Sequence, residues 1–149
     1  MLLQARGLAR HVRLPDGTTL QILIGVDLEV DAGEHVAIVG RSGTGKTTLL
    51  NLLGMLDAPS LGSYTLDGDD LLRLSERRRA RMRGARFGFV FQQFNLLAGR
   101  TALANVTAPL LYARGRQFWR REEIAARSLE RVGLGGRLES TSDKLSGGE

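Results

Sequence analysis

Hydrophobic and polar residues alternate near the start of the chain in the pattern of short strands. We predict strands over Leu2–Val12, Thr19–Ile24 and Val26–Val30, the last two rich in β-branched residues. Pro15-Asp16-Gly17 predicts a turn after the first strand, because proline presets one backbone angle and glycine permits a positive one. Strands joined by such short turns are expected to form an antiparallel layer.

The pattern changes at Val36–Val39, a continuous apolar run of the kind found in strands buried on both faces. A glycine-rich loop, Gly40–Gly45, follows this run. Beyond the loop, leucines recur at the spacing of one helix face, at positions Leu49, Leu52, Leu53 and Leu56. Strand, loop and helix together are expected to form the first half of a parallel βαβ unit.

Five further elements are predicted along the rest of the chain. They are a strand at Tyr64–Leu66 with a turn at Asp67-Gly68, an arginine-rich helix over Ser75–Arg86, a strand over Phe87–Phe91, and helices over Thr101–Tyr112 and Arg120–Val132. In the last helix we expect Ile124, Ser128, Leu129 and Val132 to share a face and Gly133 to cap the end.

Composition narrows the class of protein. A chain of 149 residues with 42% hydrophobic and 25% charged residues is that of a soluble globular domain rather than a disordered one. It contains no cysteine, which excludes a disulfide scaffold and a thiolate metal site. The N-terminus lacks the order of a secretory signal, so we expect a cytoplasmic protein. The net charge of +5 leaves nucleic acid or an anionic membrane surface open as partners.

The segment from Gly40 to Thr47 matches the pattern G-x-x-x-x-G-K-[ST], with an apolar run before it and a helical pattern after it. Glycines let backbone N–H groups wrap around phosphate oxygens, and the start of the following helix adds partial positive charge. Lys46 would reach the β- and γ-phosphates and the Thr47 hydroxyl would ligate Mg²⁺. The alternative is a glycine turn that carries a surface lysine.

A second motif, Leu145-Ser146-Gly147-Gly148-Glu149, ends the chain. Alone it could be a plain loop before a helix. A serine hydroxyl and glycine N–H groups at a helix start would make another phosphate binder. Together the two motifs point to one family.

With these motifs in place, the chain resembles the ATP-binding subunits of bacterial ABC transporters. Residues 40–47 correspond to the Walker A loop of that family, residues 145–149 to its signature, and Phe89-Val90-Phe91-Gln92 to its Q-loop. The stretches Phe87–Leu97, Thr101–Tyr112 and Ser128–Leu134 resemble the branch that serves lipoprotein release and macrolide efflux.

The resemblance implies an α/β fold: a P-loop NTPase core of the ABC type with an N-terminal antiparallel β layer and part of a helical subdomain. Residues 1–149 would form one ATP-binding domain, with the β layer and Walker A core over about 1–86 and the Q-loop and helical subdomain over about 87–149.

The resemblance also implies a set of site residues. Lys46 and Gln92 would take the catalytic roles, and Thr47 and Gln92 would hold Mg²⁺. ATP would be bound by Gly40, Arg41, Ser42, Gly43, Thr44, Gly45, Lys46, Thr47 and Thr48, and in trans by Ser146, Gly147 and Gly148 of a second subunit.

The activity implied is ATP binding and hydrolysis coupled to a membrane permease. The partners would be that permease and a second ATPase subunit in a head-to-tail homodimer on the cytoplasmic face of the inner membrane. Two alternatives stay open: a nucleotide-binding remnant without hydrolysis, and a basic nucleic-acid-associated P-loop ATPase. The signature and the Q-loop argue against the nucleic-acid alternative.

The chain departs from the family pattern in several respects, among them Ala104 in place of a glutamate and Ala98-Gly99 in place of a proline-containing turn, and two departures bear on the nucleotide site. The position where the family stacks adenine on an aromatic residue corresponds to Val12, with His11 beside it. The Walker B aspartate and glutamate and the switch histidine of the family have no counterpart, since His11 and His35 both precede the phosphate loop. We therefore expect the 149-residue chain by itself not to hydrolyse ATP.

Two other features have open interpretations. The arginines of Ser75–Arg86 are expected to form a solvated face, with anionic lipid or an acidic loop as the other reading. Trp119, the sole tryptophan, lies between Phe118 and Arg120, and we expect it to serve as a hydrophobic anchor.

Overall fold

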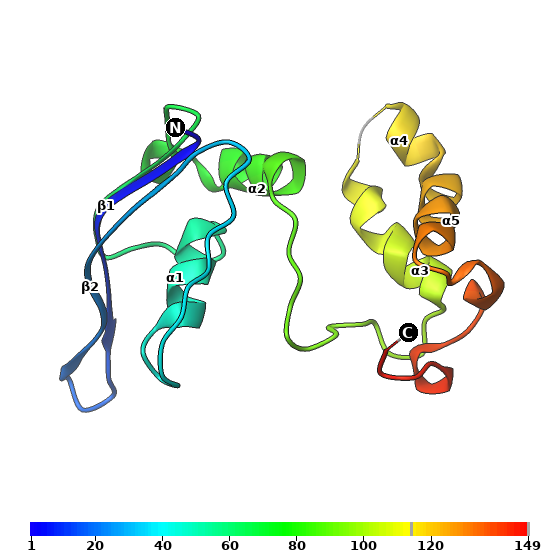
Figure 1. The fold of residues 1–149 in the computed structure, drawn as a ribbon, viewed down its shortest axis with the longest axis horizontal. Coiled ribbons are helices and arrows are strands. Elements are labelled where there is room, and N and C mark those ends of the chain that lie inside the picture. The colour runs from blue at the N-terminus through cyan, green and yellow to red at the C-terminus, as the bar shows by residue number, and fades with distance from the viewer. Residues whose placement is uncertain (114, 149) are drawn as a thin grey trace. The chain divides into compact units, whose positions relative to one another are not determined.

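The computed structural model describes residues 1–113 and 115–148. These residues form two compact units, Met1–Phe89 and Val90–Glu149. Figure 1 shows the first as a sheet with helices α1 and α2 and the second as a group of helices.

The sheet of the first unit is antiparallel throughout. Its strands are β1 (Leu3–Arg13), β2 (Thr19–Val30), β3 (Leu61–Leu66) and β4 (Asp69–Asp70), in the order β2-β1-β3-β4. The expected antiparallel layer is therefore confirmed. The two strands expected within residues 19–30 are one strand, because Gly25 takes a left-handed conformation (φ 60°) that bends the strand without ending the ladder.

Helix α1 (Lys46–Leu53) packs on the sheet through Leu49 and Leu52, which join a core that includes Leu8, Leu23 and Tyr64. The helical face predicted to reach Leu56 is shorter than expected. Gly54 caps the helix and Met55 has a positive φ of 55°, so Leu56 lies beyond the last turn and is exposed.

Two predicted strands do not form. Val36–Val39 and Phe87–Phe91 belong to no ladder within the described residues. In the first segment only Ile38 packs against the core, and Val39 is 87% exposed. The physical reason is that a strand buried on both faces is stabilised by neighbouring strands and covering layers, and the described residues supply neither to this run.

Helix α2 (Glu76–Arg86) begins after Ser75, as expected, and a 3-10 helix, η1 (Leu71–Arg73), precedes it. Half of its arginines bind other parts of the unit through their side chains, and of these three only Arg86 is exposed. These are Arg79 on the carbonyl oxygen of Leu71, Arg83 on the carbonyl oxygen of Met55, and Arg86 on the carboxylate of Asp67. The remaining three are exposed and bind nothing among the described residues; they are Arg77, Arg78 and Arg81.

The second unit is built from short helices. These are α3 (Ala102–Thr107), η2 (Ala108–Tyr112), α4 (Arg116–Trp119), α5 (Arg121–Arg131), η3 (Gly135–Arg137) and η4 (Ser142–Lys144). The predicted helix over 101–112 therefore continues as a tighter 3-10 helix after Thr107, at the point where Pro109 removes a backbone donor.

The buried face of α5 differs from the expected one. Ala125 and Leu129 are buried, whereas Ser128 and Val132 are exposed. The predicted cap is present: Gly133 has a φ of 82° and its N–H donates to the carbonyl oxygen of Glu130 at 3.0 Å. Within the described residues, no helix combines the length and the apolar character needed to cross a membrane.

Tyr64 ties the sheet to the end of α1, and this generates a stability prediction. Its ring is buried and its hydroxyl donates to the carbonyl oxygen of Leu53. We expect Tyr64→Phe to lower the free energy of unfolding by about 1 kcal/mol, since one buried hydrogen bond is lost. Urea denaturation of both proteins measures this difference.

Burial also raises the pKa of Tyr64 above its ordinary value of 10.0. The unfolded chain therefore releases this proton first as the pH rises, so the stability that Tyr64 contributes is present below pH 10 and declines above it. We expect the wild type to lose stability above that pH more steeply than Tyr64→Phe does. Equal slopes for the two proteins would contradict this expectation.

Candidate functional site

The phosphate loop, Gly40–Thr47, depends on two glycines in the left-handed conformation. Gly43 has a φ of 80° and Gly45 a φ of 86°. Residues with a Cβ rarely adopt these backbone angles. The angles turn successive N–H groups in a way that favours an anion-binding concavity. The loop is exposed along Arg41–Thr44, so a ligand can reach it from solvent.

Hydrogen bonds within the loop place the lysine ammonium against it. Lys46 Nζ donates to the carbonyl oxygen of Gly40 at 2.9 Å and to that of Arg41 at 2.6 Å. The Thr44 hydroxyl donates to the same Arg41 carbonyl at 2.9 Å. An ammonium carries three donors, so one N–H of Lys46 is left for a further acceptor.

The start of α1 adds backbone donors to the loop. Gly45 is the cap residue, and no side chain accepts a hydrogen bond from the first turn. The first backbone bond of the helix runs from the N–H of Leu49 to the carbonyl oxygen of Gly45 at 2.8 Å. The N–H groups of Lys46, Thr47 and Thr48 therefore have no partner within the helix, and the helix dipole favours an anion beside them.

A cavity of about 320 Å³ adjoins the loop. One wall comes from strand β2 and the segment before the loop, and the other from the loop and the first turn of α1. The lining residues are Leu23, Val26, Ile38, Val39, Gly40, Thr44, Gly45, Lys46 and Leu49. The apolar wall and the cationic wall face one space, which suits a ligand with both an apolar and an anionic part.

The loop lies directly against strand β2 at Gly45. A Cβ at this position would lie 2.8 Å from Leu23 Cδ2 and 3.0 Å from the carbonyl oxygen of Ile22. Gly45 is thus required both by its backbone angle and by the space available. The motif predicts this glycine, but only the packing shows the second reason.

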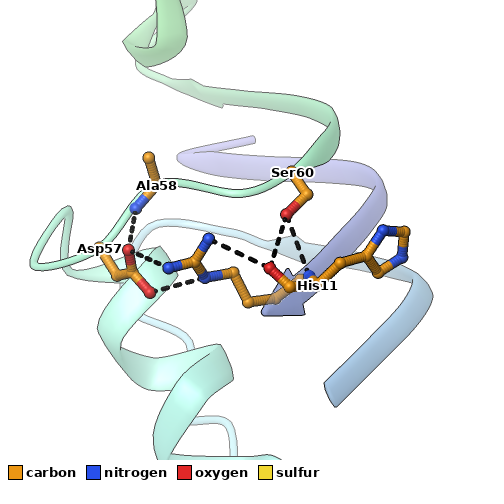
Figure 2. Close-up of polar contacts among 5 residues, drawn as sticks. His11, Asp57, Ala58 and Ser60 are labelled. Carbon is orange, nitrogen blue, oxygen red and sulfur yellow. Dashed lines mark hydrogen bonds and ion pairs between the residues drawn. The ribbon is translucent and has the colours of Figure 1, made fainter. Parts of the chain in front are cut away.

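The far end of α1 is fixed by an ion pair that the sequence did not indicate. Arg10 of β1 binds Asp57 through two hydrogen bonds, Nε to Oδ2 at 2.8 Å and Nη2 to Oδ1 at 3.0 Å. Figure 2 shows this pair beside a second link, in which the backbone N–H of His11 donates to Ser60 Oγ at 3.0 Å. The segment that follows α1 is therefore tied to β1 by side chains of both.

The remaining candidate residues lie in the second unit. Gln92 is exposed in the segment before α3, and Ser146, Gly147 and Gly148 are exposed after η4, whereas Glu149 lies outside the described residues. The structure brings together the Walker A residues in the first unit, and Gln92 and the signature residues belong to the second unit.

Asn105 on α3 organises the segment that follows Gln92. Its side chain accepts a hydrogen bond from the N–H of Leu97 at 2.7 Å and donates to the carbonyl oxygen of Thr101 at 3.1 Å. An amide that both donates and accepts can hold a loop in one conformation. Asn105 lies in the helix expected over 101–112, but the sequence does not indicate these contacts.

The phosphate loop, the uncapped helix start and the antiparallel layer are features of a P-loop domain of the α/β class. Comparison with known proteins identifies the family. The family model described as ABC transporter matches residues 23–149. The chain belongs to the ABC transporter family.

Individual relatives agree with this assignment. The chain is 50% identical, over 99% of its length, to a macrolide export ATP-binding/permease protein MacB of Rhodopirellula baltica, and spans 22% of that protein. It is 46% identical, over 99% of its length, to a lipoprotein-releasing system ATP-binding protein LolD of Shewanella frigidimarina, and spans 61% of it. The resemblance to this branch is thus confirmed.

A solved structure is similar as well. The ATP-binding cassette MJ0796, determined as a dimer in a post-hydrolysis state bound to ADP and Pi, superposes with a TM-score of 0.86 at 32% identity. The match covers 99% of this chain and 64% of that one. The expected fold class, an ABC-type P-loop NTPase, is confirmed.

The close approach at Gly45 predicts a difference between two substitutions. Gly43→Ala adds a Cβ at a positive φ with open space around it, so we expect a loss of about 1 kcal/mol in the free energy of unfolding. Gly45→Ala adds the same strain and a clash with β2, so we expect a loss of about 3 kcal/mol. Urea denaturation of the two variants tests the difference, and equal losses would contradict the close packing.

The Arg10–Asp57 pair predicts a measurable coupling. We expect a double-mutant cycle with Arg10→Met and Asp57→Asn to give about 1 kcal/mol, near the upper end for ion pairs that are partly exposed. The control is a cycle at Arg6 and Glu29, a more exposed pair of the same sheet, where a smaller coupling is expected. A coupling at Arg10–Asp57 no larger than at the control would show that the pair does not fix α1.

Proposed function

We propose that this protein is the ATP-binding subunit of a transporter and couples ATP binding and hydrolysis to the movement of a membrane permease. The observation that carries the proposal is the position of the Lys46 ammonium. Two carbonyls of the loop hold it, and the same loop leads into the start of α1, whose first N–H groups have no partner within the helix. Cationic and backbone donors thus converge where a polyphosphate would bind.

In this proposal the phosphates lie in the loop and the donors divide between them. The backbone of Gly40, Arg41, Ser42, Gly43, Thr44 and Gly45 encloses the phosphate chain, and the N–H groups of Lys46, Thr47 and Thr48 bind its oxygens. Lys46 contributes the counter-charge, because its third N–H is available to an anionic oxygen, and a charge-assisted hydrogen bond of this kind is stronger than a neutral one.

Magnesium fits the residues present as a companion of the nucleotide rather than as a resident ion. The described residues contain no cluster of three or more acidic or histidine side chains able to hold a metal alone. Mg²⁺ prefers oxygen ligands and is commonly bound through a few protein groups together with substrate phosphates. When bound, the ion neutralises phosphate charge. Thr47 would offer its exposed hydroxyl to it, and Gln92 its amide oxygen.

The signature residues would act on a second subunit. Ser146, Gly147 and Gly148 are exposed, and their hydroxyl and N–H groups suit phosphate oxygens. The similar cassette MJ0796 is described as dimeric, which supports a homodimer in which these groups meet the nucleotide of the other chain. The names of the relatives, permease protein and lipoprotein-releasing system, support a permease partner at the inner membrane.

The described residues account for binding more fully than for hydrolysis. Lys46 supplies charge, Thr47 a metal ligand, and Gln92 a link toward the metal, but we assign no described residue to orientation of the attacking water. We therefore propose hydrolysis as an activity that the family implies, and propose that residues 1–149 alone bind MgATP without turnover.

Replacement of Lys46 tests the binding site. We expect Lys46→Ala to weaken MgATP binding by about tenfold or more, because a hydrogen bond to a charged group contributes about 1.5–3 kcal/mol. Isothermal titration calorimetry on the full chain measures both affinities. Arg78→Ala is the control, because it removes an exposed charge of helix α2, and it should bind MgATP as the wild type does. Equal affinity of Lys46→Ala and Arg78→Ala would exclude the Walker A assignment.

A further inference from the structure

One end of the second unit exposes large aromatic side chains. Helix η2 ends at Tyr112, which is 90% exposed, and helix α4 ends at Trp119, which is 80% exposed. The two helices pack against each other. Leu111, at 53% exposure, belongs to the same end, so the unit presents apolar and amphipathic surface there. Trp119 is expected to serve as a hydrophobic anchor, but it is not buried within its own unit.

Trp119 is held in this position by its neighbours. The Phe118 ring meets it edge-on, with centroids 5.3 Å apart at an interplanar angle of 82°. Arg121 lies with its guanidinium 4.9 Å from the Phe118 centroid and donates to the Phe118 carbonyl oxygen at 2.9 Å. The exposed indole is thus backed by a fixed ring, and its exposure follows from the local packing of α4 against the start of α5.

Positive charge accompanies these aromatic residues. Arg116 lies one turn before Trp119 on α4 and is exposed, and its side chain forms no hydrogen bond or ion pair with the residues that the structure describes. Arg120 follows Trp119 directly, and its guanidinium donates two hydrogen bonds to the carboxylate of Glu123, from Nε at 2.7 Å and from Nη2 at 2.6 Å. Among the described arginines of η2, α4 and the start of α5, Arg116 is the one whose side chain is left for a partner.

We propose that this surface, the aromatic tip (Leu111, Tyr112, Arg116 and Trp119), binds the interface of a lipid bilayer that contains anionic lipid. Tryptophan and tyrosine are enriched at the headgroup level because their rings are apolar at one end and polar at the other. Arginine pairs with headgroup phosphate, and a bilayer accepts a tip that presents only a few side chains.

A bilayer is favoured as the occupant of the tip by the charge of Arg116 and by the names of two relatives. The free Arg116 complements anionic headgroups, and two relatives carry names that place their ATP-binding parts with a permease or a lipoprotein-releasing system. The inference rests on the proposed function only for the place of the protein at a membrane. The tip itself lies in the second unit and contains no residue of the phosphate loop. Binding to vesicles and binding of ATP can therefore succeed or fail separately.

The sole tryptophan of the chain makes the test direct, because all tryptophan emission comes from Trp119. The full chain is mixed with vesicles of phosphatidylcholine and phosphatidylglycerol in equal parts, and with vesicles of phosphatidylcholine alone. We expect a blue shift and protection from acrylamide with the anionic vesicles at low salt, and quenching by brominated lipid. Absence of a shift with the anionic vesicles, or an equal shift with both kinds, overturns the proposal.

Variants locate the contact. Arg116→Gln should weaken the apparent affinity for anionic vesicles about fivefold, as expected for one basic residue at the surface. Trp119→Ser, measured by vesicle sedimentation, should weaken this affinity about tenfold, as expected for the loss of a large side chain that the bilayer would bury. Val132→Ser, at an exposed apolar residue beyond the other end of α5, is the matched control and should leave binding unchanged.

Three outcomes separate the explanations. If Val132→Ser weakens binding as much as Trp119→Ser, the contact is not at the tip and the proposal fails. If the emission shifts only with membranes that carry a permease, the tip binds protein rather than lipid, and the proposal also fails. If Lys46→Ala binds anionic vesicles as the wild type does while losing ATP, the tip proposal stands on its own.

Discussion

The absence of a side chain at Gly45 allows the phosphate loop to lie directly against strand β2. A single methyl group there would meet Leu23 and the backbone of Ile22 within 3.0 Å. The apolar run Val36–Val39 belongs to no ladder among the described residues, so this contact and the burial of Leu49 hold the start of α1 against the sheet. The donors at the start of α1 depend on both.

The other end of α1 is fixed by polar contacts from three elements. Tyr64 of β3 donates to the carbonyl oxygen of Leu53, Arg83 of α2 donates to that of Met55, and Arg10 of β1 binds Asp57. A helix held at both ends keeps its first turn at a fixed place, and a fixed set of N–H groups binds an anion without the cost of ordering it. The binding geometry thus depends on side chains far from the motif.

The two units contribute different kinds of surface. The first presents a concave site with a lysine ammonium, backbone donors and an apolar wall. The second presents the signature residues, the Gln92 segment held through Asn105, and the exposed aromatic tip. This division matches a subunit that binds a nucleotide with one part and meets partners with the other, and the proposed 1–86 and 87–149 boundaries remain a prediction for the whole domain.

The sequence by itself determined the local chemistry and the family. The Walker A pattern, the antiparallel layer and the Gly133 cap follow from residues close together in the chain, because turns, caps and phosphate loops are set by backbone angles that particular residues favour. Tertiary structure alone decided which elements are stable and which side chains meet. Val36–Val39 reads as a buried strand but has no ladder, and Trp119 reads as an anchor but is exposed. Arg10 and Asp57 lie 47 residues apart, and such pairs carry no local signal, since burial, strand pairing and ion pairing depend on what the fold places beside each residue.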